Sequence, residues 1–210
     1  MGNGIKYTLD NKYKYEGEFS NSKKEGKGKE ETEEYVYHGD FLGDTMHGKG
    51  KLYYKAFGDS YEGEFKKGLI EGEGCYTWKN KEIYKGNFIK GKLHGKGSYY
   101  WPSGREFYGN YKDNLKEGEG EFRWKKSGTV LKCMFSKGKP SGMGELINKR
   151  KNQTKVLTIQ EIKDVLKSEK RLNKEHSFLE YVDSSIDCND IHYDLCSEKE
   201  KEKNKGEESD

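Results

Sequence analysis

The 210-residue sequence has no long apolar run. No stretch approaches the roughly 18 consecutive apolar residues that a transmembrane helix needs, and the first residues do not form the apolar core of a signal peptide. These two absences argue against a helical integral membrane protein. We therefore expect a soluble, cytoplasmic protein.

Apolar residues in general are scarce, and so is proline. Only 30% of the residues are hydrophobic while 37% are charged, which is too little apolar material for one deep core. The chain has 2 prolines, but 27 glycines and 16 tyrosines. Because apolar content is concentrated in rings and glycine is frequent, the composition favours many short strands joined by tight turns over disorder.

One pattern recurs six times along the chain. A Tyr-x-Gly-x-Phe string, or a variant of it, is centred on Gly17, Gly39, Gly63, Gly86, Gly109 and, with cysteine in the glycine place, Cys133. A Gly-x-Gly pair follows each at constant offsets, and its second glycines are Gly28, Gly50, Gly74, Gly97, Gly120 and Gly144. The period is 22 to 24 residues. A repeat kept in register six times indicates an array of identical structural units.

Each unit reads as a β-hairpin. Residues that tolerate a left-handed backbone, such as Gly68, stand between the two motifs, and a second set, such as Gly58, separates one repeat from the next. Alternation puts Tyr61 and Phe65 on one face, where folding about Gly68 predicts a Tyr61–Tyr76 pair and a Phe65–Gly72 pair. The predicted fold is therefore all-β: an elongated, single-layered, twisted antiparallel sheet of six hairpins, one face of which is an aromatic stripe.

These motifs resemble the MORN (membrane occupation and recognition nexus) repeat family over about residues 13–148. The resemblance implies the same elongated sheet. It also implies a role as a scaffold, as a membrane-proximal module or as a cytoskeletal or axonemal part, with the cell cortex, an inner membrane skeleton or a flagellum as natural locations.

The repeat pattern ends before the last third of the chain. We expect a lead-in over residues 1–12, the array over 13–148, a linker over 149–157, a helical segment over 158–182 and an acidic, disordered tail over 183–210. Thr158 and Glu161 form a capping box, and the apolar spacing after it predicts a helix over about 158–175. The helix covers either an open sheet edge or part of the aromatic face, or it binds a partner.

The aromatic stripe is the candidate partner site. A single-layered sheet leaves rings available, so the stripe could accept an extended or helical segment of another protein. Alternatively these rings are simply the core of the array. The candidate residues are Tyr61, Phe65, Tyr76, Trp78, Tyr84, Phe88, Tyr99, Trp101 and Trp124.

Basic residues suggest a second class of partner. A cluster of lysines could form a weak patch for anionic membrane lipids. Nucleic acid is not expected, since acidic residues are mixed in almost equally with basic ones. Self-association is an open alternative. The lysines of the candidate lipid patch are Lys90, Lys92, Lys96, Lys112 and Lys116.

No chemistry is predicted. Cys188, His192 and Cys196 have helical spacing for a zinc site, but they stand in a segment rich in Ser, Asp and Asn that is a poor helix candidate, so no metal site is claimed. Gly-x-Gly lies inside predicted strands without a following helix, which argues against phosphate binding. No nucleophile or general base recurs with the repeat. We expect a non-enzymatic protein without a cofactor.

Overall fold

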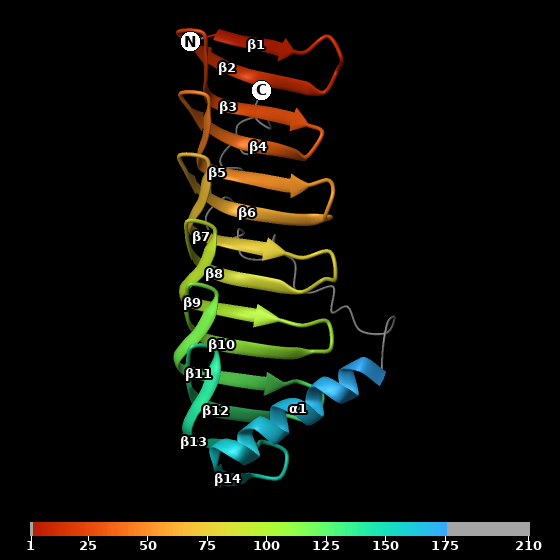
Figure 1. Cartoon of the computed structure of the whole chain (residues 1–210), viewed down its shortest axis with the longest axis vertical. Coiled ribbons are helices and arrows are strands. Elements are labelled where there is room, and N and C mark those ends of the chain that lie inside the picture. The colour runs from red at the N-terminus through yellow and green to blue at the C-terminus, as the bar shows by residue number, and fades with distance from the viewer. Residues whose placement is uncertain (1, 176–210) are drawn as a thin grey trace, which may run out of the picture.

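A computed structural model describes residues 2–175 and shows one antiparallel sheet of fourteen strands in chain order. In Figure 1 the strands stack along the long axis of the molecule, and at about 4.8 Å per strand the sheet is about 60 Å long. The strands are β1 (Gly2–Tyr7), β2 (Tyr13–Ser20), β3 (Lys23–Thr32), β4 (Tyr35–Leu42), β5 (Thr45–Tyr54), β6 (Asp59–Lys66), β7 (Leu69–Thr77), β8 (Ile83–Ile89), β9 (Lys92–Tyr100), β10 (Arg105–Lys112), β11 (Leu115–Trp124), β12 (Thr129–Ser136), β13 (Lys139–Asn148) and β14 (Gln153–Leu157).

The predicted fold class is confirmed, and two strands are added to it. β1 lies in the predicted lead-in and β14 in the predicted linker, so the sheet has one strand more at each end than six hairpins supply. Both were missed because the alternation is weak there: the six residues of β1 include two glycines, and β14 has only five residues. Each gains its structure by pairing with a neighbouring strand.

The hairpin turns lock each repeat to the one before it. Lys67 and Gly68 both have positive φ, 52° and 78°, as the tightest hairpin turns require. The Gly68 N–H donates to the Met46 carbonyl of the preceding repeat at 2.9 Å, and the Gly91 N–H donates to the Ile70 carbonyl at 2.8 Å. Neighbouring hairpins are therefore tied together beyond their strand pairing.

One predicted pairing is correct and one is wrong. Tyr61 pairs with Tyr76 as expected, but Phe65 lies opposite Ile70, and Gly72 lies opposite Phe88 of the next repeat. The register shifts between Gly63 and Phe65. Gly72, at φ 70°, takes the left-handed backbone of a β-bulge, which inserts an extra residue and was not visible as a turn signal.

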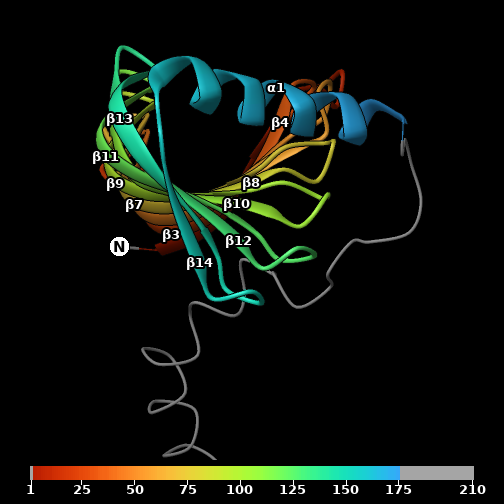
Figure 2. The same ribbon diagram turned by 90° about the horizontal axis from the view of Figure 1, so that it is seen from below.

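The core is a ladder of rings on one face of the sheet. Tyr15, Tyr37, Tyr61 and Tyr84 each lie edge to face with the Phe of their own repeat and with a ring of the next repeat. Tyr61, for example, is 5.2 Å from both Phe65 and Phe88. Edge-to-face pairs contribute about 0.5–1.5 kcal/mol each beyond area burial. The sheet curls around this ladder, so Figure 2 shows an open trough in cross-section with the helix that follows the last strand across its mouth.

Helix α1 (Ile159–Glu175) confirms the predicted helix over 158–175; residues 176–182 and the acidic tail lie outside the described part of the chain. The capping box forms: the Thr158 N–H donates to Glu161 Oε2 at 2.8 Å, and the Glu161 N–H donates to Thr158 Oγ1 at 3.3 Å. Ile162 is completely buried against the ring face, with Val165 and Leu166 packed beside it. The helix thus covers part of the aromatic face, which is one of the three alternatives that the sequence left open.

Acid should weaken the capping box at the N-terminus of α1. Hydrogen bonds from Lys155 and from Thr158 lower the pKa of the Glu161 carboxyl from 4.5 to about 2. Because the pKa of Glu161 is lower in the folded state than in the unfolded state, the ionised carboxylate stabilises the fold above pH 4.5. This stabilisation is lost as the pH falls toward 2. We expect Glu161→Gln at neutral pH, and the unaltered protein below pH 4.5, to shift the Ile162 methyl NMR signal toward its unfolded position. Gln160→Ala should leave the signal in place at neutral pH; an equal shift there would contradict the role of the capping box.

Candidate functional site

The ring face of the curled sheet is concave, and we call its side-chain-lined surface the concave groove. Its floor is the buried ring ladder, which includes Tyr61, Phe65, Tyr84 and Phe88. Glycines make this floor possible. A Cβ on Gly74 would lie within 3.0 Å of the Tyr61 ring, which rests directly over the backbone. The recurring glycines therefore serve packing, as their place inside strands predicts.

One wall of the concave groove is a continuous row of half-buried rings. Successive centroid distances are 4.7 Å from Tyr76 to Trp78, 5.2 Å from Trp78 to Tyr99 and 4.4 Å from Tyr99 to Trp101. Successive ring planes are inclined to one another by 47°, 29° and 37°, and part of each ring stays exposed. The row supplies rigid contact area of the type that protein interfaces favour.

Acidic side chains anchor this aromatic wall. The Tyr76 hydroxyl donates to Asp59 Oδ2 at 2.9 Å, and the Tyr99 hydroxyl donates to Glu82 Oε2 at 2.5 Å. Burial, and next the hydrogen bond to Glu82, raise the pKa of Tyr99 well above its ordinary value, so it stays a neutral donor. Further along, the Arg105 guanidinium lies 3.8 Å from the Trp101 ring centroid and orders the wall there.

The opposite wall is aliphatic, and the sequence-based prediction did not include it. Met46, Ile70 and Leu93 are half-buried and pack on the floor from three consecutive repeats. They stand two residues before each Gly-x-Gly pair, so strand alternation could have placed them on the ring face. They were missed because Lys24, Lys116 and Pro140 take the same place in other repeats.

The nine predicted partner residues divide into two groups. Five are buried floor or core: Tyr61, Phe65, Tyr84, Phe88 and Trp124. The other four, Tyr76, Trp78, Tyr99 and Trp101, form the half-buried wall. All nine belong to the same packed cluster, but only the second group offers surface to a partner.

The five predicted lipid-binding lysines do not share a face. Lys90, Lys92 and Lys112 lie at or beside the hairpin turns, where Lys92 is 3.8 Å from the Asp113 carboxylate. Lys96 lies on the convex face of the sheet, which is the face opposite the concave groove. Lys116 points into the ring face, with its Nζ 4.9 Å from the Phe107 ring centroid. The structure therefore does not bring the five into one patch.

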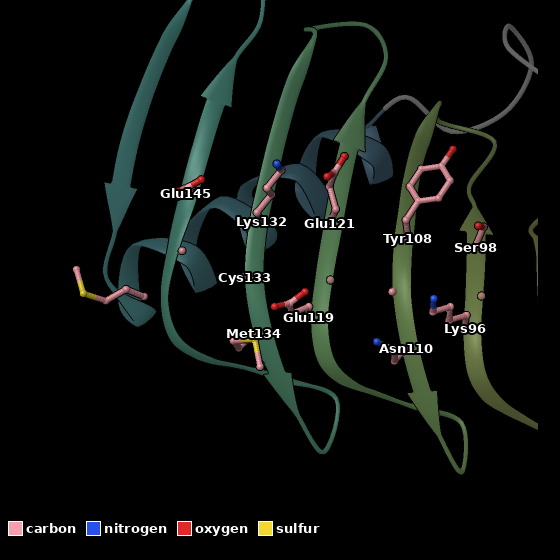
Figure 3. Close-up of a pocket in the computed structure, with 15 residues that line it drawn as sticks. Lys96, Ser98, Tyr108, Asn110, Glu119, Glu121, Lys132, Cys133, Met134 and Glu145 are labelled. Carbon is pink, nitrogen blue, oxygen red and sulfur yellow. The ribbon is translucent and has the colours of Figure 1, made fainter.

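The convex face carries a shallow trough of about 720 Å³. In Figure 3 its floor is the glycine row, and two rows of side chains border it, with Glu145, Lys132 and Glu121 in one and Met134 and Glu119 in the other. Acidic, basic and apolar side chains alternate along it. This mixture does not select one kind of ligand.

Residues 2–175 contain neither a metal-binding cluster nor a membrane-spanning helix. No group of three or more His, Cys, Asp or Glu side chains in that range is arranged to hold a metal ion. Cys188, His192 and Cys196 lie outside it. The helix present in the same range is not long and apolar enough to cross a membrane.

Comparison with known proteins identifies the repeat. A family model for the MORN repeat matches five segments, namely residues 15–32, 37–56, 61–82, 84–104 and 107–129. The chain belongs to the MORN repeat family. The five matches cover the first five hairpins of the MORN array. The sixth, in which Leu131 and Cys133 replace the motif's Tyr and Gly, still folds as β12 and β13.

Comparisons of this chain with curated proteins and with solved structures do not identify a partner. A search of curated proteins found no match. Among solved structures, the chain is similar to the TCP domain of SAS-4 (dCPAP) of Drosophila melanogaster, solved in complex with a proline-rich motif of Ana2 (dSTIL). The TM-score is 0.47 and the sequence identity 12%; the alignment covers 74% of this chain and 89% of that one.

Proposed function

We propose that this MORN array is a non-enzymatic scaffold whose concave groove binds an amphipathic helix of another protein. One observation carries the proposal: the C-terminal end of the groove already holds such a helix. Ile162, Val165 and Leu166 of α1 lie at the i, i+3, i+4 spacing of one helical face and pack on the ring cluster.

The groove continues beyond α1 with similar chemistry. In Figure 1 the helix extends over the last strands of the array, and the strands from β4 to β9 lie beyond its reach. There the aliphatic wall of Met46, Ile70 and Leu93 faces the aromatic wall that includes Trp78 and Trp101 across the buried floor. Half-buried apolar side chains on both walls suit a second helix that buries an apolar stripe between them.

A helix fits this groove better than an extended segment. A β-strand would add to a sheet edge through backbone hydrogen bonds, but the groove is a sheet face whose backbone groups are already paired. Binding there must come from side-chain packing, which the regular apolar stripe of a helix supplies. We further propose, by analogy with the family, that the complex belongs to a cytoplasmic, cytoskeletal or membrane-associated assembly.

Two substitutions in one hairpin test the proposal. Leu93 is half-buried in the groove wall, whereas Ile89 is exposed and precedes the turn of the same hairpin. We expect Leu93→Glu to reduce recovery of the partner from native cells at least tenfold, because it puts a charge into an apolar contact worth about 1.5–3 kcal/mol. Ile89→Glu should recover the partner at the level of the unaltered chain.

The readout is quantitative mass spectrometry of the purified complexes, followed by titration of the recovered partner's helical segment. Both variants must show the circular dichroism spectrum of the unaltered protein. Equal partner recovery with Leu93→Glu and Ile89→Glu would remove the concave groove as the binding site.

A further inference from the structure

The sheet begins with half a repeat. Within residues 2–175, β1 pairs with β2 alone. Its glycines, Gly2 and Gly4, stand 24 residues before Gly26 and Gly28, so β1 is a strand of the Gly-x-Gly type. Every other strand of this type pairs on both sides. The outer edge of β1 thus corresponds to the edge that elsewhere pairs with the first strand of the same repeat.

The sheet also ends with half a repeat, of the other kind. In the described chain β14 pairs with β13 alone, and it does so in the register of a first strand. Gly144 lies opposite Leu157, just as Gly28 lies opposite Gly39 at the junction of two repeats. Leu157 therefore takes the place of the central glycine of a first strand. The outer edge of β14 corresponds to the edge that elsewhere pairs with a Gly-x-Gly strand.

We propose that the outer edge of β14 binds the outer edge of β1 in a second copy of this chain, so that two half repeats complete one repeat across the junction. The register follows from the existing hairpins. Gly39 pairs with Gly50, His38 with Lys51 and Val36 with Tyr53. The equivalent pairs across the junction are Leu157 with Gly4, Val156 with Ile5, and Thr154 with Tyr7.

The side chains at this junction are suited to it. Ile5 is 58% exposed, Tyr7 65% and Val156 56%, which are high values for apolar side chains on strands. In the proposed register they meet on one face, where β-branched and aromatic cross-strand pairs stabilise a sheet. Leu157 would lie opposite Gly4, as Cys133 lies opposite Gly144 in the sixth repeat.

One pair of like charges would destabilise the junction, but a neighbouring carboxylate weakens this repulsion. Lys155 would face Lys6, and like charges directly opposite each other destabilise a sheet. However, Lys155 Nζ already lies 2.8 Å from Glu161 Oε1, so a carboxylate offsets its charge. Helix α1 does not obstruct the edge, since Figure 1 shows it leading from β14 back over the preceding strands.

Such a junction has a definite geometry. The two surfaces differ, so each copy keeps one free edge after binding, and addition continues head to tail. The sheet then continues from copy to copy, and α1 of each copy covers the C-terminal end of that copy's groove. Because each junction joins only a few residues, we expect assembly to depend strongly on concentration.

The test uses one substitution at each edge of the full chain. Analytical ultracentrifugation should show the unaltered protein forming a series of oligomers as concentration rises. Ile5→Asp and Val156→Asp should each remain monomeric alone, because one edge of every copy is blocked. An equimolar mixture of the two should form a one-to-one dimer and nothing longer, since one free β1 edge meets one free β14 edge.

Matched controls change the same strands or turns outside the proposed pairs. Asn3→Asp in β1 and Asn152→Asp before β14 should leave the oligomer series unchanged. Circular dichroism should show each variant folded. An unaltered protein that stays monomeric at every concentration would overturn the proposal. So would a dimer of Val156→Asp alone or of Ile5→Asp alone, because that pairing would join two like edges.

Discussion

Replacing Gly74 with alanine should destabilise the central repeats by about 3 kcal/mol, through overpacking of the core. The added Cβ would lie within 3.0 Å of the Tyr61 hydroxyl and of two carbons of its ring. That ring cannot move aside, because Phe65 and Phe88 hold it edge to face at 5.2 Å on either side. The Tyr61 hydroxyl would also lose its 3.1 Å hydrogen bond to the Glu64 carbonyl.

The matched control for Gly74 is Gly91. Gly91 has φ 75° and nothing within 4 Å of an added Cβ, so Gly91→Ala imposes only backbone strain, of about 1 kcal/mol. Gly74 has no such positive φ, so its substitution tests packing alone. Urea unfolding followed by tryptophan fluorescence measures both. If Gly74→Ala unfolds no earlier than Gly91→Ala, the close approach of Tyr61 does not explain the Gly-x-Gly motif.

Replacing Lys24 with methionine should destabilise the first hairpins by about 3–5 kcal/mol, the cost of breaking a buried ion pair on one side. Lys24 and Glu30 are both buried and form a salt bridge on the ring face. The Lys24 Nζ also lies 4.9 Å from the Phe41 ring centroid. Without Lys24, the buried Glu30 carboxylate keeps hydrogen bonds from the Tyr13 and Tyr35 hydroxyls, the latter at 3.0 Å, but loses the positive charge of its salt bridge.

The double substitution Lys24→Met with Glu30→Leu should restore stability to about that of the unaltered protein. The next repeat carries Met46 and Leu52 at these two places, so the array already packs this apolar pair. Well-packed apolar residues often replace a buried ion pair without loss. Thermal unfolding by circular dichroism compares the single and double variants. A double variant as unstable as Lys24→Met would show that the ion pair itself is required.

The repeated motif was sufficient to predict the class of fold. Glycine at a constant offset from Tyr and Phe requires a strand whose neighbour carries a ring, and a turn residue between the motifs requires a hairpin. Both are local constraints, and the observed strand order follows them along the whole array. The capping box of α1 was readable for the same reason, since Thr158 and Glu161 are three residues apart.

The sheet face that carries the candidate site was predictable from the sequence, but the accessible residues on that face were not. Large rings on one face indicated the surface, but ring type does not distinguish the floor from the wall. Tyr61 and Tyr76 pair directly across two strands, yet Tyr61 is 1% exposed and Tyr76 remains half-buried. The difference arises from the edge-to-face contact that Phe88 of the next repeat makes with Tyr61. Such contacts join residues more than twenty positions apart in the chain.

The sequence by itself determined the hairpins, their order, the glycine row and the helix, because each depends on residues within one repeat or one helical turn. Only the tertiary structure decided which rings stay accessible, that α1 closes one end of the groove, and that β1 and β14 form the two edges. These depend on sheet curvature, on a bulge at Gly72 and on pairing between distant strands. The six repeats are thus encoded locally, whereas the groove exists only once they are stacked.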